Sequence, residues 1–289
     1  MELSILNNID LIKLTDNKTE TPINEFDIYK ITGSDKFDFL QGQITNDINL
    51  LKTEQAICTA YCNIKGRLMG VFFLYLTNID NEEIIYLINP GNNGLNIFKS
   101  LKKYGLFSKI NINKVTDEFN VYLINTESEE KDDLISIEFP NNKLTLKLIN
   151  KTKDVNILNK EKLDNNFWKI TFINSKIPII SQITNEQFLS HNLELPKLNI
   201  INFKKGCYLG QEIIARTEYK AKLKKSALIL SGMSSNTNLN NNLINSYFLQ
   251  NNENIKTGEV IDYCIIKNKI YLLASIDNKY ISQEIKFIN

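Results

Sequence analysis

Residues 204–216 read Lys204-Lys205-Gly206-Cys207-Tyr208-Leu209-Gly210-Gln211-Glu212-Ile213-Ile214-Ala215-Arg216. One thiol lies between two glycines, which permit tight or left-handed backbone, so a constrained loop is predicted around Cys207. The good helix formers from Gln211 to Arg216 predict a helix that begins just after Gly210. Cys207 would then lie near a helix N-terminus, where the helix dipole favours a thiolate. The alternative is a small buried hydrophobe, as most free cysteines are.

The composition excludes several classes of protein. Among 289 residues, 34 Lys and Arg nearly balance 33 Asp and Glu, so no long-range field recruits nucleic acid or an anionic membrane. The single histidine, His191, excludes a multi-histidine metal site and makes a metal centre unexpected. The longest apolar run, residues 68–76, is too short to span a bilayer, and the N-terminus lacks signal-peptide features.

The four cysteines show neither disulfide-framework nor zinc-ribbon spacing. Cys58, Cys62 and Cys264 lie in apolar segments that read as strands, where buried, inert thiols are expected. A reducing compartment follows, and we expect a cytoplasmic protein.

Hydrophobic patterning predicts a mixed α+β chain. Strands are expected at 23–32, 55–63, 67–77, 83–88, 107–112 and 119–124, with Lys65-Gly66 as the turn of a hairpin and helices at 36–41 and 94–104. Residues 167–172, which carry the lone tryptophan Trp168, also read as a strand. After Lys220, short segments at 223–231, 246–250, 256–266 and 268–276 alternate with turn residues and predict a small β-barrel or sandwich.

Four segments, in order, resemble the YgfZ/GcvT folate-binding superfamily. They are Ile31-Thr32-Gly33-Ser34-Asp35 with Phe39-Leu40-Gln41-Gly42-Gln43-Ile44-Thr45-Asn46-Asp47, then Cys62-Asn63-Ile64-Lys65-Gly66-Arg67, then Leu101-Lys102-Lys103-Tyr104-Gly105-Leu106-Phe107-Ser108-Lys109 at a helix-to-strand passage, and Lys205-Gly206-Cys207-Tyr208-Leu209-Gly210-Gln211-Glu212 with Ala215-Arg216. The last segment matches the signature of the YgfZ branch. One departure concerns residues 194–200, where the two glycines that lead into this signature are missing.

The resemblance implies a ring-like α+β folate-binding body over residues 1–221, in two subdomains, and a C-terminal β-barrel over residues 222–289. It implies tetrahydrofolate as the ligand and a role in assembling or repairing the iron–sulfur clusters of client enzymes. Some of these clients thiolate tRNA, so the contact with tRNA is expected to be indirect. We expect a monomer.

A folate-dependent aminomethyltransferase is the alternative function. The glycine-cleavage T-protein, which the chain resembles, carries acidic residues just after its equivalent of Lys65-Gly66. Here the corresponding residues are Arg67-Leu68-Met69-Gly70-Val71, without a carboxylate to handle the proton of the attacking amine. We therefore do not expect a metabolic enzyme.

The resemblance also implies roles for single residues. Cys207 is the expected reactive residue, and the cations of Lys204, Lys205 and Arg216 would favour its thiolate. Trp168 and Phe26 are expected to contact folate, with core aromatics as the alternative for both.

The remaining polar residues of the signature are expected to have supporting roles. Gln211 and Glu212 are predicted to brace the loop through hydrogen bonds to backbone N–H groups. The basic residues between Lys204 and Lys225 form either a rim that attracts an acidic group or an ordinary solvated face.

Overall fold

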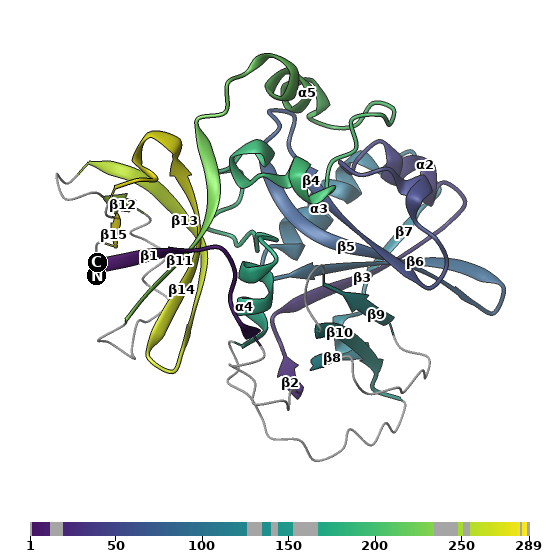
Figure 1. Ribbon diagram of the computed structural model, residues 1–289. Coiled ribbons are helices and arrows are strands. Elements are labelled where there is room, and N and C mark those ends of the chain that lie inside the picture. The colour runs from purple at the N-terminus through teal and green to yellow at the C-terminus, as the bar shows by residue number, and fades with distance from the viewer. Residues whose placement is uncertain are drawn as a thin grey trace.

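The computed structural model describes residues 2–11, 20–125, 135–139, 144–152, 167–233, 248–250, 255–283 and 285–287 (Figure 1). Within these ranges two sheets and a closed barrel are joined by short helices. The α+β class and the small barrel are confirmed. Among the helices in these ranges, none is long and apolar enough to cross a membrane.

A five-stranded antiparallel sheet forms the centre of the body. Its spatial order is β4 (Gln55–Cys62), β5 (Leu68–Ile79), β6 (Glu82–Pro90), β3 (Phe26–Thr32) and β7 (Asn111–Lys114). The predicted hairpin is confirmed, because β4 pairs with β5 across the turn at Lys65-Gly66. The predicted strand at 107–112 is shorter than expected, since residues 105–109 form turns and β7 begins at Asn111.

The two faces of this sheet bury different layers. On one face lie α2 (Lys36–Gln41) and α3 (Gly94–Tyr104), whose Leu40, Ile97 and Leu101 are buried in one apolar cluster. The other face packs toward a four-stranded sheet in the order β2 (Glu20–Ile23), β8 (Phe119–Asn125), β10 (Leu144–Asn150) and β9 (Ile135–Glu138). The 3-10 turns η1 (Ile48–Leu50) and η2 (Thr116–Glu118) connect these layers.

The segment that carries Trp168 is a helix, so its prediction as a strand is wrong. Helix α4 spans Phe167–Asn174, and six of its side chains are buried. Its aromatic and β-branched residues favour a strand locally, but a helix that is apolar all round is stable when it is enclosed. Helix α4 is enclosed between the body sheets and the barrel strand β13 (Lys256–Ile266).

The barrel contains a strand from the other end of the chain. Its order is β1 (Glu2–Leu6), β11 (Lys225–Met233), β14 (Lys269–Asp277), β13, β12 (Phe248–Gln250) and β15 (Ile285–Phe287), and β15 pairs back with β1. The two termini therefore lie side by side (Figure 1). Residues 222–289 alone do not close this barrel, because β1 completes it. The predicted assignment of β1's residues to the folate-binding body is therefore wrong. The boundary at 221/222 stays a prediction.

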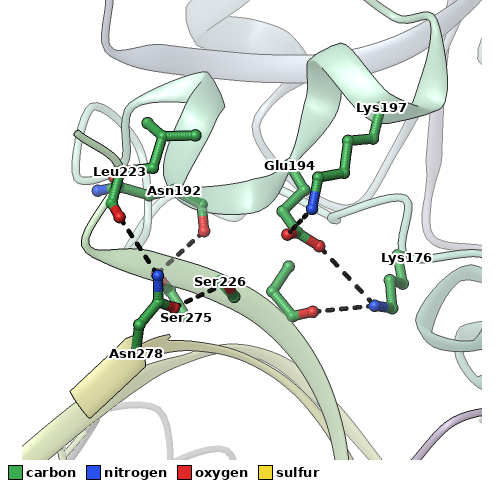
Figure 2. Close-up of polar contacts among 9 residues, drawn as sticks. Lys176, Asn192, Glu194, Lys197, Leu223, Ser226, Ser275 and Asn278 are labelled. Atoms are coloured by element: carbon green, nitrogen blue, oxygen red, sulfur yellow. Dashed lines mark hydrogen bonds and ion pairs between the residues drawn. The ribbon is translucent and has the colours of Figure 1, made fainter. Parts of the chain in front are cut away.

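Polar contacts join the barrel to the segment that leads toward Cys207. In Figure 2, Glu194 lies between Lys176 and Lys197, with Nζ–carboxylate distances of 3.9 and 2.5 Å. Ser275 in β14 donates to the carbonyl oxygen of Asn192 at 3.1 Å. The segment itself comprises η3 (Ser190–Leu193) and η4 (Leu195–Leu198), and helix α5 (Gln211–Lys220) follows the loop; η6 (Asn278–Tyr280) continues from β14.

Candidate functional site

Helix α5 begins where predicted, directly after Gly210. Gly210 has a φ of +80°, and a Cβ atom at this position would lie 2.5 Å from the carbonyl oxygen of Asn63. Only glycine fits such a left-handed position against a neighbouring backbone. The turn of the β4–β5 hairpin therefore touches the N-cap residue of the helix.

That turn is built by its own asparagine. The Asn63 side-chain oxygen accepts from the backbone N–H groups of Lys65 at 2.9 Å and Arg67 at 3.0 Å. Gly66 supplies the positive φ of +67°, and the side chain of Ile213 lies close to it. The second and fourth segments of the resemblance thus meet at the start of α5.

Lys205 fastens the loop to the first segment of the resemblance. Its Nζ donates to the carbonyl oxygens of Gln41, Ile44 and Asn46 at 2.7, 2.8 and 2.9 Å. Lys205 is 8% exposed and lies over the ring of Tyr208, 5.0 Å from its centroid. Burial lowers the pKa of Lys205 to about 8, which leaves the ammonium protonated at neutral pH.

Further hydrogen bonds attach the loop and its approach to the same segment. Leu209 N–H donates to the Gly42 carbonyl at 3.0 Å, the side chain of Asn46 donates to the Asn199 carbonyl at 3.1 Å, and the Thr45 hydroxyl donates to the Ile200 carbonyl at 2.8 Å. Both sides of the Cys207 loop are therefore attached to residues 41–47.

The approach to the loop makes its turns without the expected glycines. Glu194 and Asn199 both have left-handed φ angles, 55° and 56°. Asparagine tolerates this conformation, and Glu194 is held by its two lysine partners. The turns therefore form although the glycines are missing.

Cys207 is the exposed cysteine of the four, so the alternative that it is a buried hydrophobe is not supported.

Gly206 beside Cys207 is also exposed, has no positive φ, and would leave open space around an added Cβ. Of the two alternatives, tight or left-handed backbone, the left-handed one therefore holds for Gly210 and not for Gly206. Gln211 braces the loop, but its amide donates to the carbonyl of Gly206 at 3.4 Å rather than accepting from an N–H. Glu212 and Arg216 lie exposed on α5.

The basic residues near the thiol are fewer at the surface than the sequence suggested. Lys205 is buried in its carbonyl cage, and Lys225 pairs with Glu259 at 3.0 Å. The exposed cations are Lys204, Arg216, Lys220, Lys222 and Lys224. A basic rim and a solvated face both remain compatible with this set.

The predicted burial of the other cysteines is confirmed for Cys62 and Cys264 but not for Cys58. Cys62 and Cys264 are buried and Cys58 is half-buried. Burial raises the pKa of Cys58 and of Cys62 to about 12, so both stay protonated thiols.

His191 is buried with Nε2 3.0 Å from a Glu218 carboxylate oxygen, and burial lowers its pKa. No cluster of three metal-ligating side chains occurs in the described residues.

A cavity of about 710 Å³ lies between the two sheets and the approach to the Cys207 loop. It is lined by apolar side chains such as Phe73, Ile137 and Leu198 and by the polar residues Glu138 and Lys197. Asn199 and Ile200, which residues 45 and 46 hold in place, also line it. Single-sequence patterns gave no signal for this cavity, because its walls come from segments about 150 residues apart.

Trp168 and Phe26 pack against each other in the core. Their ring centroids are 5.2 Å apart, and their exposed fractions are 1% and 4%. Phe172 packs against Trp168 at 5.6 Å and against Phe73 at 6.2 Å. Phe73 lines the cavity, whereas Trp168 lies behind that aromatic wall. Contact of Trp168 or Phe26 with folate stays a prediction.

A solved structure has the same fold. The glycine cleavage system aminomethyltransferase T from Bartonella henselae superposes with a TM-score of 0.59 over 93% of this chain and 82% of that protein, at 10% identity. This likeness defines the class: an aminomethyltransferase-T-like fold. No family model matches the chain.

Curated relatives give the family itself. Proteins named tRNA-modifying protein YgfZ are 30% identical in Buchnera aphidicola subsp. Baizongia pistaciae, covering 74% of this chain and 73% of the relative, and 31% identical in Buchnera aphidicola subsp. Schizaphis graminum, covering 72% of each. Another from Colwellia psychrerythraea is 28% identical over 72% of this chain and 70% of its own length. The chain belongs to the family of tRNA-modifying protein YgfZ.

Proposed function

We propose that this protein is a folate-binding accessory factor that supports assembly or repair of iron–sulfur clusters and thereby tRNA modification. Membership in a family named for tRNA modification supports the link to tRNA. The observation that carries the proposed chemistry is the exposed Cys207 on a loop attached to two other segments of the resemblance. If Cys207 served only to pack the core, its side chain would be buried.

The cavity is our candidate site for tetrahydrofolate. Its volume of about 710 Å³ lies in the range of about 300–1,000 Å³ that is usual for small-molecule sites. The flat pterin and benzoyl rings suit the apolar wall of Phe73, Ile137 and Leu198. The Glu138 carboxylate would accept from pterin N–H groups, and Lys197 would attract the carboxylates of the glutamate tail. When bound, the folate would supply one-carbon chemistry.

Calorimetric titration with tetrahydrofolate tests this site. We expect Glu138→Ala and Lys197→Ala each to weaken binding about tenfold, and Lys147→Ala, on β10 and outside the cavity lining, to leave it unchanged. Equal affinities for all four proteins would place the ligand elsewhere.

The role of Cys207 is tested in a strain that lacks this protein. Cys207→Ser should abolish the thiolation of tRNA that depends on iron–sulfur enzymes, while its circular dichroism spectrum stays unchanged. Cys264→Ala, which removes a buried barrel thiol, is the matched control and should complement. Full complementation by Cys207→Ser would refute the reactive role.

Aminomethyl transfer is the second candidate, and its support is the shared fold. The residues after Gly66 weigh against it, because Leu68 and Met69 are buried apolar side chains with no carboxylate at these positions. Turnover of methylene-tetrahydrofolate with an amine donor would revive this function.

The partners follow from the proposal. We infer that the protein acts in the cytoplasm on iron–sulfur client enzymes and contacts tRNA only through them. None of the four cysteines is joined in a disulfide, which is consistent with that compartment.

A further inference from the structure

The corner between α3 and β7 exposes apolar side chains that the fold could have buried. Phe107 is 100% exposed, Leu106 is 74% exposed, and Tyr104 is 41% exposed. These three residues all lie at positions 104–107, and we call the surface of this segment the α3–β7 corner. A contiguous exposed apolar surface on a folded chain marks an interaction site more often than an isolated exposed leucine does.

The corner is held rigid although its side chains point outward. Lys109 N–H donates to the Asp35 carboxylate at 2.8 Å, and Asp35 N–H donates to the Lys109 carbonyl at 3.4 Å. Ser108 N–H donates to the Gly105 carbonyl at 3.1 Å. A pre-ordered backbone lowers the entropy that a partner must remove on binding.

The charges around the corner indicate the chemistry of the partner. Exposed lysines stand at positions 99, 102, 103 and 109, on both sides of the corner in the sequence, and Lys102 Nζ lies 4.6 Å from the centroid of the Phe98 ring. Cations beside exposed apolar side chains complement a partner with carboxylates beside an apolar pocket. Aromatic anchors at the centre of such a surface supply most of the binding energy in protein complexes.

The charge of the whole chain favours protein over nucleic acid as the partner. Its 34 Lys and Arg nearly balance 33 Asp and Glu, so no long-range field recruits a phosphate backbone.

The corner also lies near the candidate site. It is bonded to the start of α2 through Asp35, and the Cys207 loop is bonded to the end of α2 through Gln41 and Gly42. Six helical residues span roughly 9 Å. Figure 1 shows α2 between β7 and the loop that leads to α5.

We propose that the α3–β7 corner docks an acidic, apolar-pocketed segment of a protein partner, with Phe107 as the anchor. That this partner is a client presented to Cys207 rests on the proposed function; the docking surface itself does not.

A photo-crosslinking amino acid placed at position 107 tests the docking surface in living cells, with position 233 as the matched control. Met233 is 71% exposed on the barrel strand β11. We expect one protein to be captured at 107 through an Asp- and Glu-rich segment and not at 233. That protein, once purified, should bind at least tenfold more weakly to Phe107→Ser and to Lys103→Glu, and equally to wild type and Met233→Ser.

Several results would overturn the docking surface. They are an absent adduct, an adduct with nucleic acid or with a second copy of this chain, and affinities that Phe107→Ser leaves unchanged. Cys207→Ser separates the two proposals, because it should bind the captured protein normally even though it fails to support tRNA thiolation. Normal complementation by Cys207→Ser together with weakened binding by Phe107→Ser would refute the reactive thiol alone.

Discussion

The Nζ atom of Lys205 lies 2.7 Å from the carbonyl oxygen of Gln41, the last residue of α2. Two further carbonyls, of Ile44 and Asn46, complete the cage around this ammonium group. A lysine two residues before the candidate reactive thiol therefore acts inward, on the backbone of a segment more than 150 residues away. Its position links the architecture of the body to the placement of Cys207.

Removal of this cation should destabilise the protein. Lys205→Met keeps the length of the side chain but leaves buried carbonyls without their donor, and we expect a loss of roughly 3 kcal/mol in the free energy of unfolding. Urea denaturation followed by tryptophan fluorescence measures it. Lys204→Met, at an exposed position, should change stability by less than about 0.5 kcal/mol. Similar losses in the two variants would show that the cage contributes little.

The two glycines of the loop should respond differently to alanine. Gly210→Ala forces a Cβ atom to within 2.5 Å of the Asn63 carbonyl at a φ of +80°, and should cost more than about 1 kcal/mol of stability. Gly206→Ala meets open space and should leave the denaturation midpoint unchanged.

A functional assay of Gly206→Ala then has a clear meaning. If this stable variant fails to restore tRNA thiolation, the glycine is needed for something that approaches the loop and not for folding. If Gly206→Ala proves as unstable as Gly210→Ala, the loop differs from the geometry described above.

Local sequence signals predicted the features that local chemistry determines. The start of α5 after Gly210 and the hairpin around Lys65-Gly66 follow from residues within a few positions of each other. The residues around Trp168 favour a strand locally, whereas the enclosure of α4 on most sides decides the outcome. The barrel strand β1 pairs with Lys286 and Ile285 at the far end of the chain, a relationship that no local pattern reveals.

In the candidate site, too, local patterns predicted some features, and residues distant in sequence decided the others. The exposure of Cys207 agreed with its glycine-flanked setting, but the inward direction of Lys205 and the open space at Gly206 depend on residues distant in sequence. The resemblance implies folate contacts for Trp168 and Phe26, yet it could not show that Phe172 and Phe73 lie between Trp168 and the cavity.

A half-buried carboxylate, that of Asp262 at the joint of barrel and body, should make stability depend on pH. Asp262 lies at a register shift in β13, with Oδ2 buried and without a hydrogen-bond partner in the described residues. Burial raises its pKa to about 7, against a partial opposing effect of the Lys169 ammonium. Between pH 4 and 7 the folded state holds more protons here than the unfolded state, so this group lowers stability as the pH rises.

Asp262→Asn tests this dependence. The variant should be more stable than wild type at pH 8, by on the order of 2 kcal/mol, because no charge is buried. The gain should vanish toward pH 4, where the wild-type carboxyl is neutral in both states. Denaturation midpoints at pH 4, 6 and 8 measure the difference. A gain that is equal at all three values would contradict the assignment to Asp262.

The aromatic wall of the cavity gives a last prediction, which separates packing from ligand contact. Phe73 lines the cavity, whereas Trp168 lies behind it and is 1% exposed. Trp168→Phe should therefore lower stability by about 1–3 kcal/mol through lost packing and leave the dissociation constant for tetrahydrofolate within twofold of wild type. Phe73→Leu should weaken tetrahydrofolate binding by about tenfold, since it removes a flat ring from the wall. Denaturation and calorimetric titration on the same two variants provide both quantities. If Trp168→Phe instead weakens binding more than Phe73→Leu does, the ligand reaches the tryptophan, and the wall must open when folate binds.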